Sequence, residues 1–540
     1  APDYLLAPGQ SRLWMLERLR GDGPSPFLMH ATIEVENELD RCALNDAFRG
    51  VLDKHSALRS CFVQTNQGAV RQKVVELECI DAEVTWLAGL IEDDSLINYS
   101  RAETRKPFDL SAAPLVRLSG GLLKSGKTVL FITMHHIVSD GWSIGIFSRE
   151  LTKNYAQATN SSGTKVVETS NLGALEYSDY ADWHRRWLVS EAGKRSANFW
   201  VQHFEIPIEA LDLPVLSSRP KVKQSKGKSV SIDIDQKTWA QYKDLLCDSG
   251  MSEFAGLFSV LQLVLARLSG QSNFSIGTAV AGRNQQTLEN IVGFFVNVLP
   301  LRSTLGMTQS VDEFLEAAAN EVNACLEHQN VPFETIVSNL DISRDPSRSP
   351  LFDVLLVLQN TQVEAIKFGD TESAVKALDS ETSQYDLTIN AFSDSNGELR
   401  LIAEYDCVIY SAENIELLLR SVYQCLKMLP ISRSSLLSEV PWFPSHDLAL
   451  VESFEGKPFD STPELLHAIV GRIANSAKGK IVDMESSWSY SKLVSEIERI
   501  ANLIDFRFHE HGLPLTPLDR QIHVGVIGER LVKSVAAMLG

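Results

Sequence analysis

The chain of 540 residues has no long run of apolar residues. No window approaches the roughly 18 to 20 consecutive apolar residues that a membrane-spanning helix needs. The first residues, APDYLLAPGQSRLW, also lack the basic segment followed by an apolar segment that marks a secretory signal. These absences exclude an integral membrane protein, and they predict a cytoplasmic protein or a fragment of one.

Cysteine is scarce as well. The seven cysteines are widely scattered and never stand in the C-x-x-C spacing. Zinc ribbons and fingers need such pairs, and disulfide frameworks need a much higher cysteine density. We therefore expect reduced thiols in the protein core and no metal site.

Positive charge is also in deficit, with 50 Lys and Arg against 69 Asp and Glu, a net charge of -19. Nucleic-acid binding depends on clustered basic residues that release counterions from phosphates. This balance excludes an extended nucleic-acid surface and favours proteins or small molecules as partners. The apolar content of 44% and the charged content of 22% are typical of globular proteins, and the length allows roughly two to four domains.

Short strand-like runs alternate with amphipathic stretches along the chain, which predicts mixed α/β layers. Clear strand-like runs are TVLFITM (128–134), NFSIGTAV (273–280), FDVLLVLQN (352–360) and ELRLIAEYD (398–406). A Pro- and Ser-rich break at 429–447 precedes a new helical pattern at 489–504, so we expect a domain boundary there. The chain has no exact internal repeat, which leaves solenoids and propellers unsupported.

The stretch MHHIVSDGWSIGIF (134–147) contains two possible catalytic centres. Because successive side chains of a strand alternate between faces, His135 and His136 at the end of the first run must point in opposite directions. One ring should pack inward and the other should face a cavity, which argues against a shared metal ion. A helix should begin at about Trp142 or Ser143, capped by Asp140 or Ser143.

The competing interpretation takes Gly141-Trp142-Ser143-Ile144-Gly145 as the nucleophile elbow of a serine hydrolase. The motif does lie between a predicted strand and a predicted helix, as that fold requires. The fold also needs a His-Gly-Gly oxyanion loop upstream, and none precedes residue 141. His184, His203 and His328 lie downstream, but none has a distinctive position at a strand end.

Further motifs favour the histidine centre. The string His135-His136-x-x-x-Asp140-Gly141 resembles the core motif of the condensation domains of nonribosomal peptide synthetases, which are related to the chloramphenicol and dihydrolipoyl acyltransferases. Six further stretches resemble other signatures of that family and follow one another in the family's order: LAPGQSRLWML (6–16), KHSALRSCF (54–62), YSDYADW (177–183), VGFFVNVLPLR (292–302), HQNVPFE (328–334) and RDPSRSPLF (344–352). Departures are small: Lys54 and Ser56 replace the usual Arg and Glu, and Asn330-Val331 replaces Asp-Tyr.

The resemblance implies an α/β fold, a pseudo-dimer of two chloramphenicol-acetyltransferase-like sandwiches that meet in a V around a central tunnel. We expect an N-terminal lobe at 1–180, a C-terminal lobe at 181–430 and a linker at 431–455. Residues 456–540 resemble the start of an adenylation domain, through SSWSYSKLVSEIERIANLI (486–504) and VGVIGERLVKSVAAMLG (524–540). The ATP phosphate loop of that family is absent from this tail, so we do not expect it to activate an amino acid.

The implied reaction is formation of an amide (peptide) bond between a carrier-bound acyl or peptidyl thioester and the amine of a carrier-bound aminoacyl acceptor. A thioester is already activated, so this acyltransferase needs no nucleophile, no metal and no bound cofactor of its own. Partner carrier proteins, upstream for the donor and downstream for the acceptor, would supply 4'-phosphopantetheine, and an adenylation domain would lie in the same chain of a multifunctional synthetase of secondary metabolites. Alternatives are an epimerase of the same fold, a degenerate carrier-docking platform and the serine hydrolase.

The resemblance also implies roles for individual residues. His136 is the expected catalytic base or positioning group, and His135 is structural. Asp140 is expected to form a buried ion pair with Arg59, and Gly141 to bring its backbone N–H close to the channel.

More candidates surround this loop. Trp142 and Ser143 are expected to pack and to cap the helix rather than to react. Four more residues are expected to line the tunnel or to bind phosphopantetheine, although each could instead belong to a surface ion pair: Asn297, Arg302, Arg344 and Arg348.

Overall fold

The computed structural model divides the chain into two compact units, residues 1–448 and 449–540. It describes residues 3–448 except 20–24, 161–174, 217–218, 343–344, 360–365, 369–370, 374, 378–381, 394–396 and 446, and in the second unit 480–482, 487–489 and 491–500. In these parts of the chain, no single helix is long and apolar enough to cross a membrane; α7 (Gln236–Asp248) and α8 (Glu253–Ser269) pass that test only as a pair bent by 107°.

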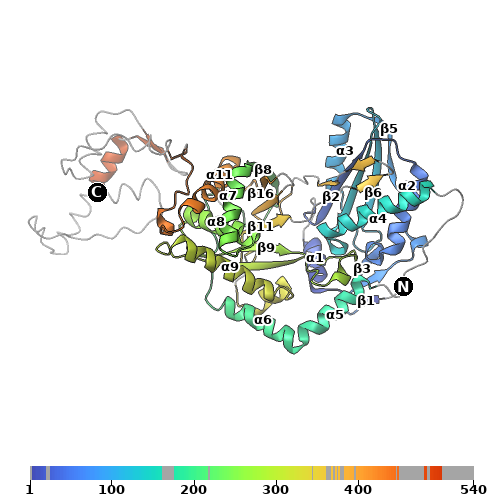
Figure 1. Cartoon of the computed structure of the whole chain (residues 1–540), viewed down its shortest axis with the longest axis horizontal. Helices are drawn as coiled ribbons and strands as arrows, with labels where there is room; N and C mark the ends of the chain where they lie inside the picture. Colours follow the sequence, from blue (N-terminus) through green and yellow to red (C-terminus); the bar gives the residue numbers. More distant parts are fainter. Residues whose placement is uncertain are drawn as a thin grey trace, which may run out of the picture. The chain divides into compact units, whose positions relative to one another are not determined.

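The first lobe is built on a five-stranded sheet (Figure 1). Its strands are, in spatial order, β14 (Val375–Ala377), β2 (Leu28–Val35), β7 (Thr128–His135), β6 (Val116–Leu123) and β5 (Thr85–Ile91). The central strand β7 is buried along its whole length, as its apolar run predicts. The helices of this lobe are α1 (Pro8–Leu19), α2 (Arg41–Lys54), α3 (Asp93–Arg105) and α4 (Gly141–Asn160), and α2 packs against α4. A small sheet joins β1 (Asp3–Leu5), β4 (Val70–Val74) and β3 (Ser60–Gln64).

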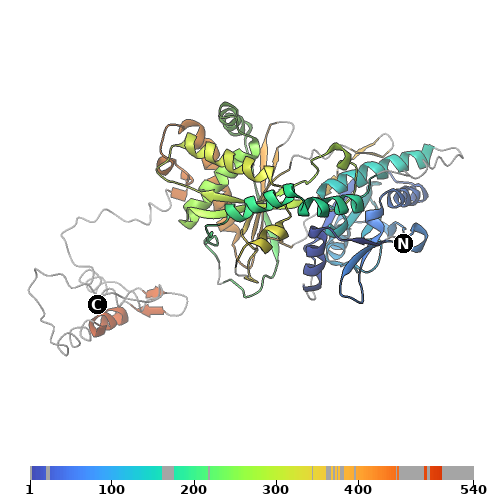
Figure 2. The same ribbon diagram turned by 90° about the horizontal axis from the view of Figure 1, so that it is seen from below.

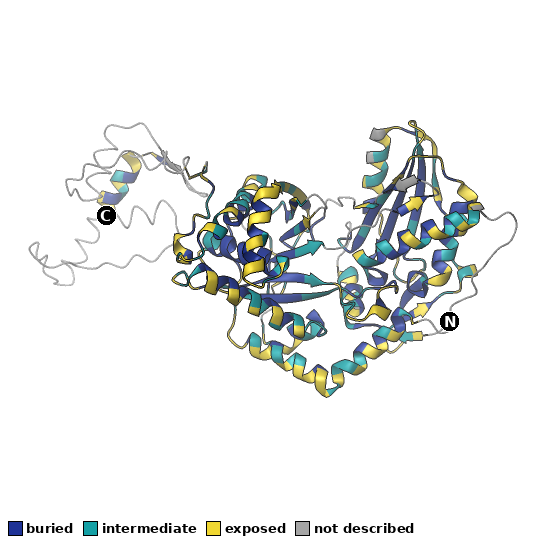
Figure 3. Cartoon of the chain, viewed as in Figure 1, coloured by how far each residue is buried: buried dark blue, intermediate teal, exposed yellow. Residues whose placement is uncertain are grey.

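The second lobe is built on a six-stranded mixed sheet. Its strands are, in spatial order, β10 (Asn297–Thr304), β9 (Asn273–Val280), β11 (Val354–Gln359), β15 (Leu387–Ser393), β16 (Leu399–Asp406) and β8 (Gly227–Ile234). β11 runs parallel to both of its neighbours, and the other pairs are antiparallel. The core of this lobe includes α7, the apolar helix α8, α9 (Val311–Glu327) and α11 (Ala412–Met428), and Figure 3 shows the buried strands beside the buried faces of these helices. The first unit also contains a short helix, α10 (Phe333–Asn339), and a two-stranded ribbon, β12 (Ile366–Phe368) with β13 (Thr371–Ser373), which contacts α4 and β2 of the first lobe.

Two connections show that the lobes do not separate at one point of the sequence. The boundary predicted between residues 180 and 181 lies inside α5 (Tyr177–Val189), which is followed directly by α6 (Glu191–His203) (Figure 2). Strand β14 comes late in the sequence, yet it pairs with β2 in the sheet of the first lobe. The sheet of the first lobe therefore depends on a strand that lies far away in the sequence.

Together the two lobes give the α/β class that the strand and helix patterns predict. All seven cysteines are free thiols, but Cys42, Cys79 and Cys247 are exposed, so the expectation of core positions was wrong for these three. In the second unit, the structure describes a hairpin of β17 (Lys480–Val482) with β18 (Ser487–Ser489) and a helical segment at 491–500. The remainder of the expected adenylation segment lies outside the described residues.

Candidate active site

The histidine loop connects the central strand of the first lobe to a long helix. β7 ends at His135, a short 3-10 turn covers His136–Val138, and α4 begins at Gly141. The helix thus begins one or two residues earlier than predicted. Asp140 is its cap, because its carboxylate accepts the backbone N–H of Ser143 at 2.8 Å.

The two histidines lie in different surroundings, as the strand alternation predicts. His135 is 1% exposed. Its Nδ1 accepts the N–H of Ile137 at 3.0 Å, and its Nε2 lies 3.3 Å from a carboxylate oxygen of Glu17 on α1. This ring therefore holds the loop against the first helix.

His136 instead lines a cavity of about 340 Å³. Its Nδ1 lies 3.4 Å from the carbonyl oxygen of Ser139, and because a carbonyl can only accept, Nδ1 carries the hydrogen. The lone pair of the neutral ring is then on Nε2. Burial lowers the pKa of His136 to about 4, with His135 as a second cause, so the imidazole is neutral at pH 7.

Residues of both lobes line this cavity, and its volume is within the range of small-molecule sites. Its walls include aromatic residues, among them Tyr177 and Phe294. The Tyr177 hydroxyl donates a hydrogen bond of 2.6 Å to the backbone carbonyl of Phe294. Arg12 of the first lobe forms an ion pair of 3.2 Å with Glu334 of the second, and both line the cavity. Of the predicted residues, His136, Gly141 and Asn297 are part of the lining.

Asp140 is fully buried, and its carboxylate accepts hydrogen bonds from both lobes. The guanidinium of Arg283 lies 3.1 Å from Oδ1, and the backbone N–H of Phe295 lies 3.1 Å from Oδ2. Ser143 donates both its N–H and its hydroxyl to Oδ1, at 2.8 and 2.7 Å. Asp140 therefore fixes the start of α4 and the 283–295 segment of the second lobe in one arrangement.

The prediction that Asp140 pairs with Arg59 was wrong. Arg59 donates to the carbonyl oxygens of Leu52 at 2.9 Å, Asp53 at 3.3 Å and Val75 at 2.9 Å. The last carbonyls of a helix have no partner within the helix, and a nearby arginine satisfies them well. Arg59 thus caps the end of α2.

Ser143 has no access to the cavity. The residue is 0% exposed, and its hydroxyl donates to Asp140 and lies 3.2 Å from both the N–H of Gly293 and the guanidinium of Arg283. A nucleophile elbow needs an exposed hydroxyl beside a histidine base. The indole N–H of the neighbouring Trp142 donates to the carbonyl of Glu289 at 2.9 Å, which again joins the two lobes.

The remaining candidates have mostly structural contacts. The Asn297 amide donates to the carbonyls of Gln329 and Val331 at 2.8 and 2.7 Å. Arg302 donates to the carbonyls of His203 and Ile206 at 2.9 and 3.0 Å, and Arg348 forms an ion pair of 2.5 Å with Asp353. Arg344 lies outside the described residues.

Sequence reasoning missed Arg283 and Glu17, which contact the loop, and the Arg12–Glu334 pair, which joins the two lobes at the cavity. Arg12 and Glu334 both lie inside motifs quoted above, so their position in the site had a sequence signal. Arg283 had none, because it lies 143 residues after Asp140 and outside every quoted motif.

Comparisons with known proteins identify the family of this chain. The family model described as "Condensation domain" matches residues 1–446. The chain is 30% identical over 546 residues to surfactin synthase subunit 2 of Bacillus subtilis (strain 168), covering 99% of this chain and 14% of that protein. It is 30% identical over 540 residues to malpinin synthetase of Mortierella alpina, covering 97% of this chain and 7% of that protein. The chain thus spans a small part of these curated relatives.

Solved structures share the fold at lower sequence identity. The X-domain from teicoplanin biosynthesis has a TM-score of 0.73 at 21% identity, covering 82% of this chain and 98% of that one. A four-domain nonribosomal peptide synthetase bound to AMP and glycine has a TM-score of 0.71 at 20% identity, covering 94% of this chain and 39% of that one.

Proposed function

The chain belongs to the condensation-domain family, and on this premise we propose that it forms amide bonds between two carrier-bound substrates. The amine of an aminoacyl acceptor attacks the carbonyl of an acyl or peptidyl thioester donor, and the thiol of the donor's carrier arm leaves. The observation that carries the proposal is the neutral imidazole of His136, whose Nε2 is left as an acceptor beside a cavity lined by both lobes.

His136 acts in this proposal by accepting a hydrogen bond from the attacking amine. An uncharged ring is needed for that role, and burial keeps the ring uncharged at pH 7 by lowering its pKa to about 4. A ring with this lowered pKa binds a proton weakly, because each unit by which the pKa falls weakens proton binding by about 1.4 kcal/mol. We therefore assign His136 mainly to holding the amine in line with the thioester carbonyl.

Gly141 supplies a second contribution in this proposal. It is the first residue of α4, where backbone N–H groups have no partner within the helix and the helix dipole is positive. The residue lines the cavity, and a methyl group added to its Cα would meet no atom within 4 Å. Its N–H is thus our candidate donor to the oxyanion that develops on the thioester carbonyl.

The wider organisation follows from the same premise. We propose a cytoplasmic segment of a larger peptide synthetase, in which 4'-phosphopantetheine arms of upstream and downstream carrier proteins deliver the substrates through a tunnel. The linker and the adenylation start remain part of this proposal, and so do the two lobes, with strand β14 added to the first. Alignments that extend over 97% to 99% of the chain support a tail that continues into a neighbouring domain.

The test is a transfer assay with purified carrier proteins, one loaded with a donor acyl thioester and one with an aminoacyl thioester. We expect the amide product on the acceptor carrier, detected by mass spectrometry of the intact carrier. Release of free acid without amide would indicate a hydrolase, and a change in donor stereochemistry without amide would indicate an epimerase. Either outcome would contradict the proposal.

A serine substitution separates condensation from hydrolase chemistry. We expect Ser143→Ala to retain most of the transfer activity, because the hydroxyl is buried and serves as a hydrogen-bond partner of Asp140. Its cost in stability should be about 1 to 3 kcal/mol, because buried groups lose a hydrogen bond. A fluorophosphonate probe should leave the parent protein unlabelled, and covalent labelling at Ser143 would overturn the assignment.

A further inference from the structure

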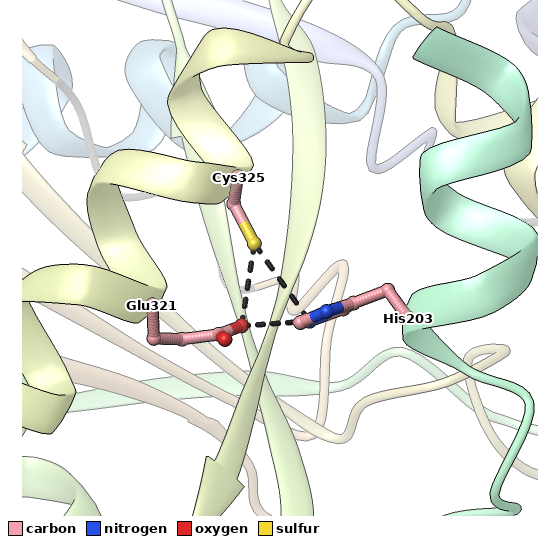
Figure 4. A group of neighbouring side chains, drawn as sticks. All are labelled: His203, Glu321 and Cys325. Atoms are coloured by element: carbon pink, nitrogen blue, oxygen red, sulfur yellow. Dashed lines mark hydrogen bonds and ion pairs between the residues drawn. The ribbon is translucent and has the colours of Figure 1, made fainter. Parts of the chain in front are cut away.

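We propose that His203, Glu321 and Cys325 form a binding site for a single Zn²⁺ ion in the second lobe. Glu321 and Cys325 are one turn apart on α9, so both side chains lie on the same helix face. His203 is the last residue of α6 and points toward them (Figure 4). The three ligand atoms, one nitrogen, one oxygen and one sulfur, all lie within 4.8 Å of one another.

The distances between these atoms are close to those of a tetrahedral zinc site. Zinc bonds of about 2.0 to 2.3 Å place neighbouring ligand atoms about 3.3 to 3.8 Å apart. The Cys325 Sγ lies 3.9 Å from His203 Nε2 and 3.2 Å from Glu321 Oε1, and Nε2 lies 2.9 Å from Oε1. Shifts of a few tenths of an ångström would bring the three atoms to coordinating positions.

Neighbouring groups already hold two of the ligands. The backbone N–H of Arg302 donates to Glu321 Oε1 at 2.7 Å, and its guanidinium donates to the backbone carbonyl of His203 at 2.9 Å. The ring of Phe199 stacks on the His203 imidazole, with centroids 5.2 Å apart. Outer contacts of this kind orient metal ligands and limit the entropy lost on binding.

The charges also suit a divalent ion. A thiolate and a carboxylate neutralise Zn²⁺, and the neutral imidazole adds no charge, so the loaded site has no net charge. The Cys325 thiol is buried, whereas the side chains of His203 and Glu321 are 16% and 17% exposed, which leaves solvent access for a water as fourth ligand.

Metal binding would replace an existing hydrogen-bond network. Without an ion, the thiol of Cys325 donates to a carboxylate oxygen of Glu321 at 3.2 Å. Loading therefore requires loss of the thiol proton, with Zn²⁺ taking its place on sulfur and one proton released to solvent. Coordination through Nε2 places the imidazole hydrogen on Nδ1, since the nitrogen that binds the ion must offer a lone pair. Affinity should fall as the pH is lowered.

The experiment uses Co²⁺ and Zn²⁺ added to the metal-free protein. We expect one equivalent of Co²⁺ to produce the near-ultraviolet absorption of a thiolate–cobalt bond, and Zn²⁺ to remove it by competition. Cys325→Ala should abolish this band, and Glu321→Gln and His203→Asn should each weaken binding by more than the about 10- to 100-fold that loss of an outer contact costs.

Cys425→Ser is the matched control, because Cys425 is also buried in the second lobe but is not part of the cluster. It should bind as the parent does. Circular dichroism of each metal-free variant checks that it is folded. The thiolate–cobalt absorption band of the parent protein tests the site without any substitution. A parent without a thiolate band, or a Cys325→Ala variant with the parent's band, would mean that the cluster is a hydrogen-bonded contact between α6 and α9 only.

Discussion

His136→Ala should reduce the rate of amide formation between loaded carriers by about 10², the loss that follows when a reacting group is misplaced by about 1 Å, and by up to about 10⁴ if the ring also takes the proton. The reason is geometric: the substitution removes the acceptor Nε2 from the cavity wall while β7 and α4 on either side keep their contacts. The measurement is the single-turnover rate of product formation with saturating carriers, so that binding does not obscure the chemical step.

His136→Gln distinguishes positioning from proton transfer. A glutamine oxygen can accept a hydrogen bond but cannot take up a proton near pH 7. Because the pKa of His136 is lowered to about 4, we expect the glutamine variant to retain more activity than the alanine variant. Equal losses in the two variants would mean that His136 takes the proton. An alanine variant as active as the parent would remove His136 from the mechanism altogether.

Asp140→Ala should lower the free energy of unfolding by about 3 to 5 kcal/mol, because it leaves the guanidinium of Arg283 buried without its carboxylate. Arg283 is 2% exposed, and it also donates to the carbonyls of Leu288 and Ile291 at 2.6 and 2.7 Å. The measurement is chemical denaturation of the parent and the variant. A variant with the parent's midpoint would contradict a structural role for this aspartate.

A double-mutant cycle identifies the partner of Asp140. Asp140→Ala combined with Arg283→Ala should destabilise by less than the sum of the single changes, with a coupling of about 0.5 to 3 kcal/mol. Asp140→Ala combined with Arg59→Ala is the matched control. Since Arg59 binds the carbonyls at the end of α2, these two effects should add within about 0.5 kcal/mol. A strong coupling to Arg59 would restore the pairing that the sequence resemblance implied.

Local features of the site were predictable because they depend on neighbours in the sequence. The apolar run at 128–134 forms the buried strand β7, and alternation along it places His135 against Glu17 and His136 at the cavity. The cap of α4 followed in the same way from the residue types at 140 and 143. Each of these inferences spans only a few residues.

Contacts between distant segments could not be predicted by the same reasoning. The residue types alone do not tell which arginine pairs with the Asp140 carboxylate. The pairing with Arg283 instead of Arg59 depends on how the two lobes meet. The strand pairing of β14 with β2 also has no local signal, because its partner lies more than three hundred residues earlier. The same holds for His203, Glu321 and Cys325, since the spacing rules for zinc motifs consider only ligands that are close in the sequence.

The pairing of Asp140 with Arg283 limits how two condensation domains can be recombined. In a chimera that joins a first lobe from one parent to a second lobe from another, this carboxylate and this guanidinium come from different parents, as do β2 and β14. A crossover placed in the α5–α6 segment therefore keeps these contacts only if the first-lobe parent supplies the aspartate, the second-lobe parent supplies the arginine, and the edges of β2 and β14 match. Compatibility of parents can thus be screened at these positions before any gene is assembled.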